Sequence, residues 1–300
     1  MEGGNARMRA AALCGRLAKL TQMPVQTGRV HSVFAHAVNL ALDGREGLIS
    51  LVRSDRTLPP YAVSVETPYL LNEAGVSAGM AAAVGNGKVE IPQAGISLDC
   101  SRAERADLRL DSVQAANANV RLKERVPVLL DLLRETDGDG LSPLVTGRGG
   151  NVYSCFLENR VAHLVQAVAG GEAQRAALAA ERIAGCGPGL TPSSDDLLNG
   201  YLGALRVIFN AQGTPQKTDM LRVMAERAAG MTNRISASFL LACGEGLAAQ
   251  DYLALLTLIF SDADDARIKS AAKAVLSVGS TSGGDMLTGL VLALTHHTEG

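Results

Sequence analysis

The second half of the chain contains Gly187-Pro-Gly-Leu-Thr-Pro-Ser-Ser-Asp-Asp-Leu-Leu-Asn-Gly200, and a related stretch, Gly279-Ser-Thr-Ser-Gly-Gly-Asp-Met-Leu-Thr-Gly289, follows later. We call these stretches the first and the second signature. Each begins as a turn of small residues, continues with hydroxyl side chains, and reaches an acid that opens an apolar helix. Superposing Asp196 on Asp285 also superposes Gly200 on Gly289. Two such helix starts in one domain predict one composite site.

Helix capping explains only part of this pattern. Thr191 followed by Pro192 is typical of a helix start, because Thr accepts a bond from a backbone N–H group and Pro lacks an N–H that would have no partner there. Capping does not explain Gly200 and Gly289, since a glycine inside a helix costs about 1 kcal/mol relative to Ala. A glycine one turn after each acid indicates that another backbone or a ligand approaches closely.

The predicted site suits a small ligand with an anionic end and an amide end. Backbone N–H groups at helix starts attract phosphate and carboxylate, while acids beside them accept N–H donors of an amide or ureide, or hold a hydrated Mg²⁺. These alternatives stay open, as does a role of the acids in tying down neighbouring loops. The candidate catalytic residues are Asp196 and Asp285, and the candidate substrate-binding residues are Gly189, Thr191, Ser193, Asp195, Arg234, Ser282 and Gly283.

Arg234 is a candidate because it opens a further helix in Thr232-Asn-Arg-Ile-Ser236, where a guanidinium can pair with an anion through two hydrogen bonds. The alternative for Arg234 is a plain surface arginine at a helix start. The glycines of the first signature do not form a nucleotide P-loop, since no Gly-Lys-Ser/Thr follows them.

Composition excludes several classes of protein. A chain of 300 residues with 47% hydrophobic content can bury a substantial core. A net charge of -2 and an aromatic content of 3% argue against a nucleic-acid partner. No apolar stretch approaches the roughly 20 residues of a membrane-spanning helix. Five scattered cysteines without a CxxC pair fit a reducing compartment, so we expect a cytoplasmic protein with no membrane partner.

The spacing of apolar residues predicts an α+β protein. We expect a β-rich N-terminal domain at 1–111 and a helical domain carrying both signatures at 112–300. The first domain is expected to begin with an amphipathic helix, because Arg7, Arg9, Arg16 and Lys19 interleave there with Ala and Leu. Strands are predicted at 30–34, 48–52, 62–65 and 88–91, with a hairpin turn at Gly85-Asn86-Gly87. Helical spacing at 113–134 is predicted to break or restart at Pro127. Residues 137–140 and 147–151 are predicted to form a linker or a working loop. Further helices are predicted at 158–169, 172–185, 193–209, 217–229, 234–248, 251–260, 264–277 and 284–296.

Several stretches resemble one known family, the AllH-type (YlbF-like) subunit family of oxamate carbamoyltransferase, formerly a domain of unknown function. They are Gly185–Gly200, Thr232–Ser236 and Thr281–Gly289, together with Val30-His-Ser-Val-Phe34 and Val38-Asn-Leu40 near the N-terminus. The resemblance covers most of the chain. One departure is Ser194, which stands where that family usually has Gly and would narrow the space above the helix start.

The resemblance implies participation in the phosphorolysis of oxalurate to oxamate and carbamoyl phosphate, during the anaerobic allantoin degradation of purine catabolism. It implies other oxamate carbamoyltransferase subunits and a small anionic substrate as partners. It transfers no catalytic residue to this chain. Three roles stay open: an enzyme subunit active only in a complex, a non-catalytic assembly subunit, and a stand-alone enzyme on another carbamoyl or amide substrate.

Overall fold

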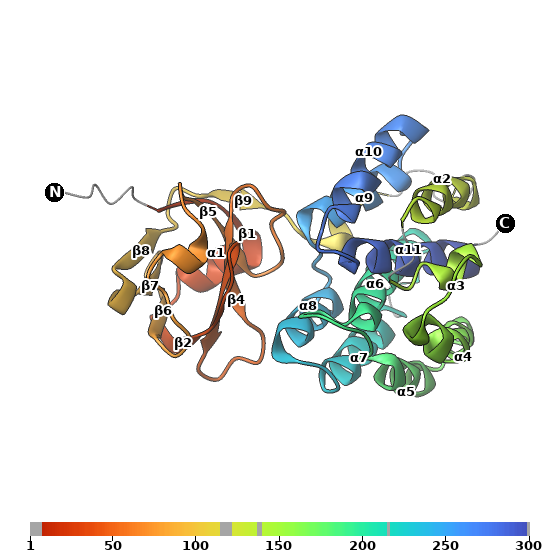
Figure 1. Ribbon diagram of the computed structural model, residues 1–300, viewed down its shortest axis with the longest axis horizontal. Coiled ribbons are helices and arrows are strands. Elements are labelled where there is room, and N and C mark those ends of the chain that lie inside the picture. Colours follow the sequence, from red (N-terminus) through yellow and green to blue (C-terminus); the bar gives the residue numbers. More distant parts are fainter. Residues whose placement is uncertain (1–7, 115–121, 137–139, 215–216, 299–300) are drawn as a thin grey trace. The chain divides into compact units, whose positions relative to one another are not determined.

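The computed structural model describes residues 8–114, 122–136, 140–214 and 217–298 (Figure 1). The chain divides into two compact units between Leu108 and Arg109. The first unit is rich in strands and the second is helical, which confirms the predicted α+β class.

One mixed sheet forms the first unit. Among its described residues, nine strands follow the order β8-β7-β6-β2-β3-β4-β5-β1-β9. Neighbours pair antiparallel except β4 with β5 and β1 with β9, which pair parallel. The strands are β1 (Arg9–Cys14), β2 (Gln26–Val33), β3 (Ala37–Leu42), β4 (Ile49–Arg53), β5 (Ala62–Glu66), β6 (Ala81–Gly85), β7 (Lys88–Ile91), β8 (Ile96–Asp99) and β9 (Glu104–Ala106). The four strands predicted from the sequence all lie in this sheet.

The predicted hairpin turn joins β6 to β7. Gly85 pairs with Lys88, and Asn86 adopts a φ of 47°, the left-handed conformation that Asn and Gly tolerate in such turns. The leading helix is shorter than predicted. The segment Arg9–Cys14 is strand β1, paired with β5 and β9, and the helix α1 occupies only Gly15–Thr21. Pairing on both edges outweighs the helix propensity of the Ala-rich segment; the earlier Arg7 lies outside the described residues.

The second unit is a helical assembly around two central helices, α6 and α11. Its helices are α2 (Leu122–Arg134), α3 (Pro143–Thr146), α4 (Val152–Ala169), α5 (Ala173–Ile183), α6 (Ser193–Ala211), α7 (Thr218–Ala229), α8 (Arg234–Gly244), α9 (Gln250–Ile259), α10 (Asp265–Leu276) and α11 (Ser282–His297). The helices predicted from residue 158 onward are all present, although α4 begins earlier because Asn151 caps it.

Pro127 does not break α2, contrary to the prediction. The helix runs through it, with Val128, Leu129 and Leu132 buried in the core of the unit. A proline in a helix removes one backbone hydrogen bond, and burial of the following turn holds α2 together across that gap. The expected helical spacing at 115–121 lies outside the described residues.

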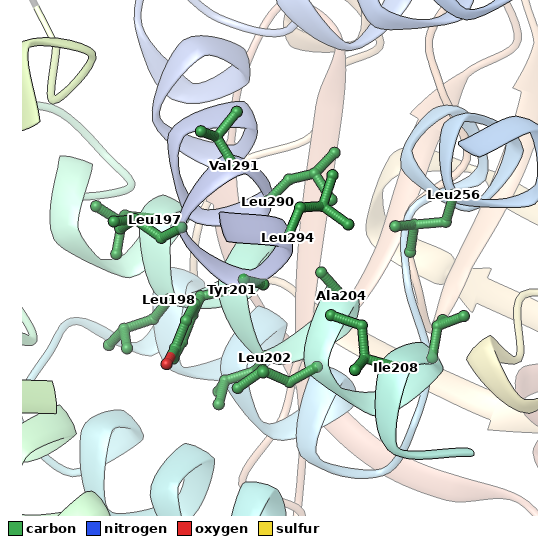
Figure 2. Packing of buried hydrophobic residues seen from close by; sticks show 14 of the residues in the cluster. Leu197, Leu198, Tyr201, Leu202, Ala204, Ile208, Leu256, Leu290, Val291 and Leu294 are labelled. Atoms are coloured by element: carbon green, nitrogen blue, oxygen red, sulfur yellow. The ribbon is translucent and has the colours of Figure 1, made fainter. Parts of the chain in front are cut away.

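The glycines of the two signatures pack α6 against α11. A Cβ atom on Gly200 would lie 1.9 Å from the carbonyl oxygen of Met286, and one on Gly289 would lie 2.1 Å from that of Leu197. Leu197 and Met286 each follow the acid of their own signature, so the contact is reciprocal, as in a two-fold symmetric interface. The two glycines predicted the close approach of either a backbone or a ligand, and the group that approaches each of them is the backbone of the other helix. Figure 2 shows apolar side chains of both helices meeting around this crossing.

Candidate functional site

The crossing of α6 and α11 brings the two signature acids together. Asp196 is 5% exposed and Asp285 is fully buried. The Thr191 hydroxyl donates to Oδ2 of Asp196 at 2.9 Å and lies 3.1 Å from the hydroxyl of Ser282, at the start of the other signature helix. Burial, and to a smaller extent the nearby negative charge of Asp285, raises the pKa of Asp196. Residues from both signatures thus form one cluster, which we call the acid pair with its hydroxyls. It consists of Asp196 and Asp285 with the hydroxyls of Thr191, Ser193 and Ser282.

Each signature supplies a serine hydroxyl to the acid of the other signature. Ser282 approaches Asp196, and Ser193 approaches Asp285, closely enough to lower the pKa of each carboxyl. Ser193 and Ser282 occupy equivalent positions, three residues before their own acids. Each serine therefore serves the acid of the other copy, so neither helix start is complete without its counterpart.

The surroundings of the two acids differ in one respect. Oδ1 of Asp285 accepts a hydrogen bond from the backbone N–H of Leu141 at 2.6 Å. Oδ2 of Asp285 is buried and receives no hydrogen bond of normal geometry, although the hydroxyls of Ser193 and Thr281 are close. A buried carboxylate oxygen without a donor is costly.

Burial sets the protonation of the pair. Loss of hydration raises the pKa of Asp196 from 3.8 to about 8, against the lowering effect of the Ser282 and Thr191 hydroxyls. The same cause raises the pKa of Asp285 to about 6, where the Leu141 N–H group and two hydroxyls oppose it. Both carboxyls therefore hold a proton more tightly than ordinary aspartates do, and Asp196 holds it more tightly than Asp285. Carboxyl pairs that differ in this way are a recurring basis for acid–base chemistry.

Asp195, a predicted substrate-binding residue, is engaged by the protein. Its Oδ1 accepts from the Gly185 N–H at 2.7 Å, and its Oδ2 accepts from the hydroxyls of Thr232 and Ser236. These bonds fasten the loop before α6 to the start of α8. Arg234 is exposed at the first position of α8, next to Asn233, whose side chain caps that helix.

The remaining predicted residues fall into two groups. Thr191, Ser193 and Ser282 belong to the acid pair with its hydroxyls. Gly283 packs against the end of α10, since a Cβ there would lie 2.1 Å from the carbonyl oxygen of Val275, and Gly189 is exposed with a φ of 96°. Close packing and a left-handed backbone account for these two glycines, and their binding of substrate stays a prediction.

Two details of the first helix start differ from the prediction. Pro192, rather than Thr191, is the capping residue of α6, and the Thr191 hydroxyl serves Asp196 instead of a backbone N–H group. Ser194 is fully buried, and its hydroxyl accepts a hydrogen bond from the N–H of Cys186 at 2.8 Å. The side chain that was expected to narrow the space above the helix instead holds the preceding loop.

Sequence reasoning missed the loop that covers Asp285. A Cβ on Gly140 would lie 2.4 Å from Oδ1 of Asp285, and the Gly140 carbonyl accepts a hydrogen bond from the Asn151 side chain. Asn151 also caps α4. Gly140 ends one of the segments predicted as a linker or working loop, and it lies against the acid pair; residues 137–139 are outside the described part. The glycine was the only sequence signal for this contact.

Within the described ranges, the chain has neither a cluster of metal-ligating side chains nor a membrane-spanning helix. No group of three or more His, Cys, Asp or Glu side chains there could hold a metal ion, so Mg²⁺ at the acid pair stays an open prediction. None of the helices described is long and apolar enough to cross a membrane.

Two family models match this chain. Residues 183–294 match the family described as oxamate carbamoyltransferase subunit AllH, and residues 8–105 match the AllH family N-terminal domain. No curated protein and no solved structure matches the chain. The two matched segments cover most of the sequence, and the first of them contains both signatures. The chain belongs to the AllH family of oxamate carbamoyltransferase subunits.

Proposed function

We propose that this chain binds the substrate of a cytoplasmic oxamate carbamoyltransferase complex at the acid pair with its hydroxyls. The reaction would be the phosphorolysis of oxalurate to oxamate and carbamoyl phosphate in anaerobic allantoin degradation. The observation that carries the proposal is the pairing of two buried carboxyls of different proton affinity, Asp196 and Asp285, inside the segment that matches the subunit family.

The chemistry of the substrate matches this pair. A phosphate oxygen attacks the carbamoyl carbon of oxalurate, the bond from that carbon to the oxamate nitrogen breaks, and the nitrogen takes up a proton. A neutral Asp196 can supply this proton as a general acid. The ionised Asp285 can accept an N–H group of the ureide through Oδ2, the oxygen that has no hydrogen bond within the protein. Together, the two acids would present a proton donor and a hydrogen-bond acceptor to the carbamoyl group.

The test is carbamoyl transfer by the reconstituted complex carrying single variants. Asp285→Asn keeps one oxygen for the Leu141 N–H group and puts an NH2 donor in place of the acceptor Oδ2, so it should raise KM at least tenfold. Asp196→Asn keeps a neutral hydrogen-bond donor but cannot give up a proton, so kcat should fall about 100-fold, within the usual range for general acid catalysis, with KM nearly unchanged. Asp262→Asn, at an exposed acid of the same unit, is the control. Wild-type kinetics in both acid variants would refute the proposal.

Two other roles predict different results. A non-catalytic assembly subunit predicts that neither variant changes the kinetics of the complex. A stand-alone enzyme on another carbamoyl or amide substrate predicts turnover by the purified chain without other subunits. Calorimetric titration of the complex with oxamate and with phosphate, with and without Mg²⁺, adds an independent measure, because loss of oxamate binding in Asp285→Asn would place the ligand at this acid.

A further inference from the structure

Large apolar side chains are exposed around the loop of the first signature. Val152 is 73% exposed, Phe156 51%, Leu190 56% and Met231 54%. Within the part of the chain that the structure describes, these are four of the seven exposed large hydrophobic residues. Single exposed apolar residues need no explanation, whereas a group of them marks an interaction site.

Contacts link these residues to the same loop. Phe156 stacks under the Arg160 guanidinium at 4.0 Å, and Arg160 donates a hydrogen bond to the carbonyl of Arg182, just before the loop. On the other side, the Met231 carbonyl lies 2.6 Å from where a Cβ on Gly185 would be. The Leu190 carbonyl accepts a hydrogen bond from the side chain of Asn233. Helix α4 and the turn before α8 therefore flank the loop that leads to Thr191.

The charges in these segments have one sign. Residues 147–156, 182–190 and 231–234 contain three arginines, Arg148, Arg182 and Arg234, and no acid, although the whole chain has a net charge of -2. Arg160 adds a fourth positive charge beside Phe156, while the acids that adjoin these segments are Glu158 on α4 and Glu181, whose carboxylate pairs with Arg227. We call the four apolar residues and these four arginines the arginine–apolar face. Arg, Met and aromatic residues are the types that protein interfaces concentrate, whereas Lys and Glu are depleted there.

We propose that the arginine–apolar face binds another subunit of the carbamoyltransferase. The contact surface of that partner would present apolar side chains surrounded by carboxylates. The inference rests on the proposed function for the identity of the partner, and the family description as a subunit implies that one exists. A small anion would engage arginines but leave the apolar side chains in water, so a protein surface fits the whole face better. Docking there would place the partner against the loop that carries Thr191, next to the acid pair.

The test measures assembly rather than turnover. The full chain is co-expressed with the other subunits of its complex, and dissociation constants are measured by mass photometry for Phe156→Glu and Leu190→Glu. Loss of a central apolar anchor should weaken assembly at least about 30-fold. Val25→Glu, in the sheet unit and 49% exposed, is the matched control and should assemble like wild type. Arg148→Glu should slow association at low salt, with a smaller effect at high salt.

Each outcome decides the proposal. Wild-type assembly by both Phe156→Glu and Leu190→Glu, with wild-type circular dichroism, would overturn it. Weaker phosphate binding in Arg148→Glu without any change in assembly would also overturn it and make the face an anion site. If Phe156→Glu is misfolded, Phe156→Ser and Leu190→Glu decide. If this proposal fails, Asp285→Asn should still raise KM. If the proposed function fails, Phe156→Glu and Leu190→Glu should still weaken assembly, so the two failures are distinguishable.

Discussion

Replacing Asp196 by Asn should stabilise the protein, and by an amount that grows with pH. The folded chain holds the proton of Asp196 up to a pKa of about 8, whereas an unfolded chain releases it near the ordinary value of 3.8. Between these two values the folded state binds more protons than the unfolded state, so the free energy of unfolding falls as pH rises. Asn is never ionised, and the variant therefore escapes this loss.

The size of the effect follows from the two proton affinities. Each tenfold difference in proton affinity between the folded and the unfolded chain corresponds to about 1.4 kcal/mol. The full loss in the free energy of unfolding at pH 9 is therefore on the order of 5 kcal/mol. At pH 4 both side chains are largely neutral, and wild type and variant should agree to within about 1 kcal/mol, the usual value of one altered hydrogen bond. The gap between wild type and Asp196→Asn should open steadily from pH 5 to pH 8.

Urea denaturation of both proteins at pH 5, 7 and 9 provides the assay. Asp195→Asn is the matched control, because Asp195 is equally buried but accepts three hydrogen bonds from the protein. This neighbouring change should destabilise the fold by about 1–3 kcal/mol at pH 7, since Asn cannot accept with both of its side-chain atoms. Parallel stability curves for wild type and Asp196→Asn across the whole pH range would show that burial does not hold the proton, and would refute the reasoning.

Two further predictions concern packing and capping. Gly200→Ala should destabilise the protein by about 3 kcal/mol or more in thermal melts, because its methyl group would overlap the Met286 carbonyl. Gly284→Ala, where a Cβ meets only a side chain at 4.0 Å, should remain within about 1 kcal/mol of wild type; equal losses in both variants would contradict the close crossing. Asn151→Ala should cost about 1–2 kcal/mol and speed amide hydrogen exchange at Leu141, and unchanged exchange there would argue against the loop being held by this cap.

Local patterns in the sequence predicted much of the helical unit. Helix positions follow from apolar spacing, and the repeated acid with a glycine one turn later correctly indicated a close approach. The contact at Gly200 involves Met286, which lies far along the chain, and the internal repeat was the sequence signal that linked the two positions. A repeated pattern thus carried long-range information that a single signature would not.

The partners of individual polar groups were beyond sequence reasoning. The Leu141 N–H group that binds Asp285 belongs to a loop 144 residues earlier, and nothing in the local pattern specifies that pairing. Thr191 has the residue type of a helix cap, yet its hydroxyl donates to Asp196 in the first turn of α6 and lies 3.1 Å from the hydroxyl of Ser282, which only tertiary packing brings near. Strand β1 was likewise mistaken for helix, because its pairing partners β5 and β9 come later in the chain. Such choices depend on topology rather than on propensity.

The reciprocal crossing of α6 and α11 also determines when the acid pair can exist. During synthesis, Ser193 and Asp196 leave the ribosome well before Asp285, and contacts between distant segments form late because loop closure must come first. Until α11 arrives, the carboxyl of Asp196 lacks the neighbouring helix that buries it and should titrate as an ordinary acid. The unusual proton affinity at this site is therefore a property that a nascent chain acquires late, when α11 docks.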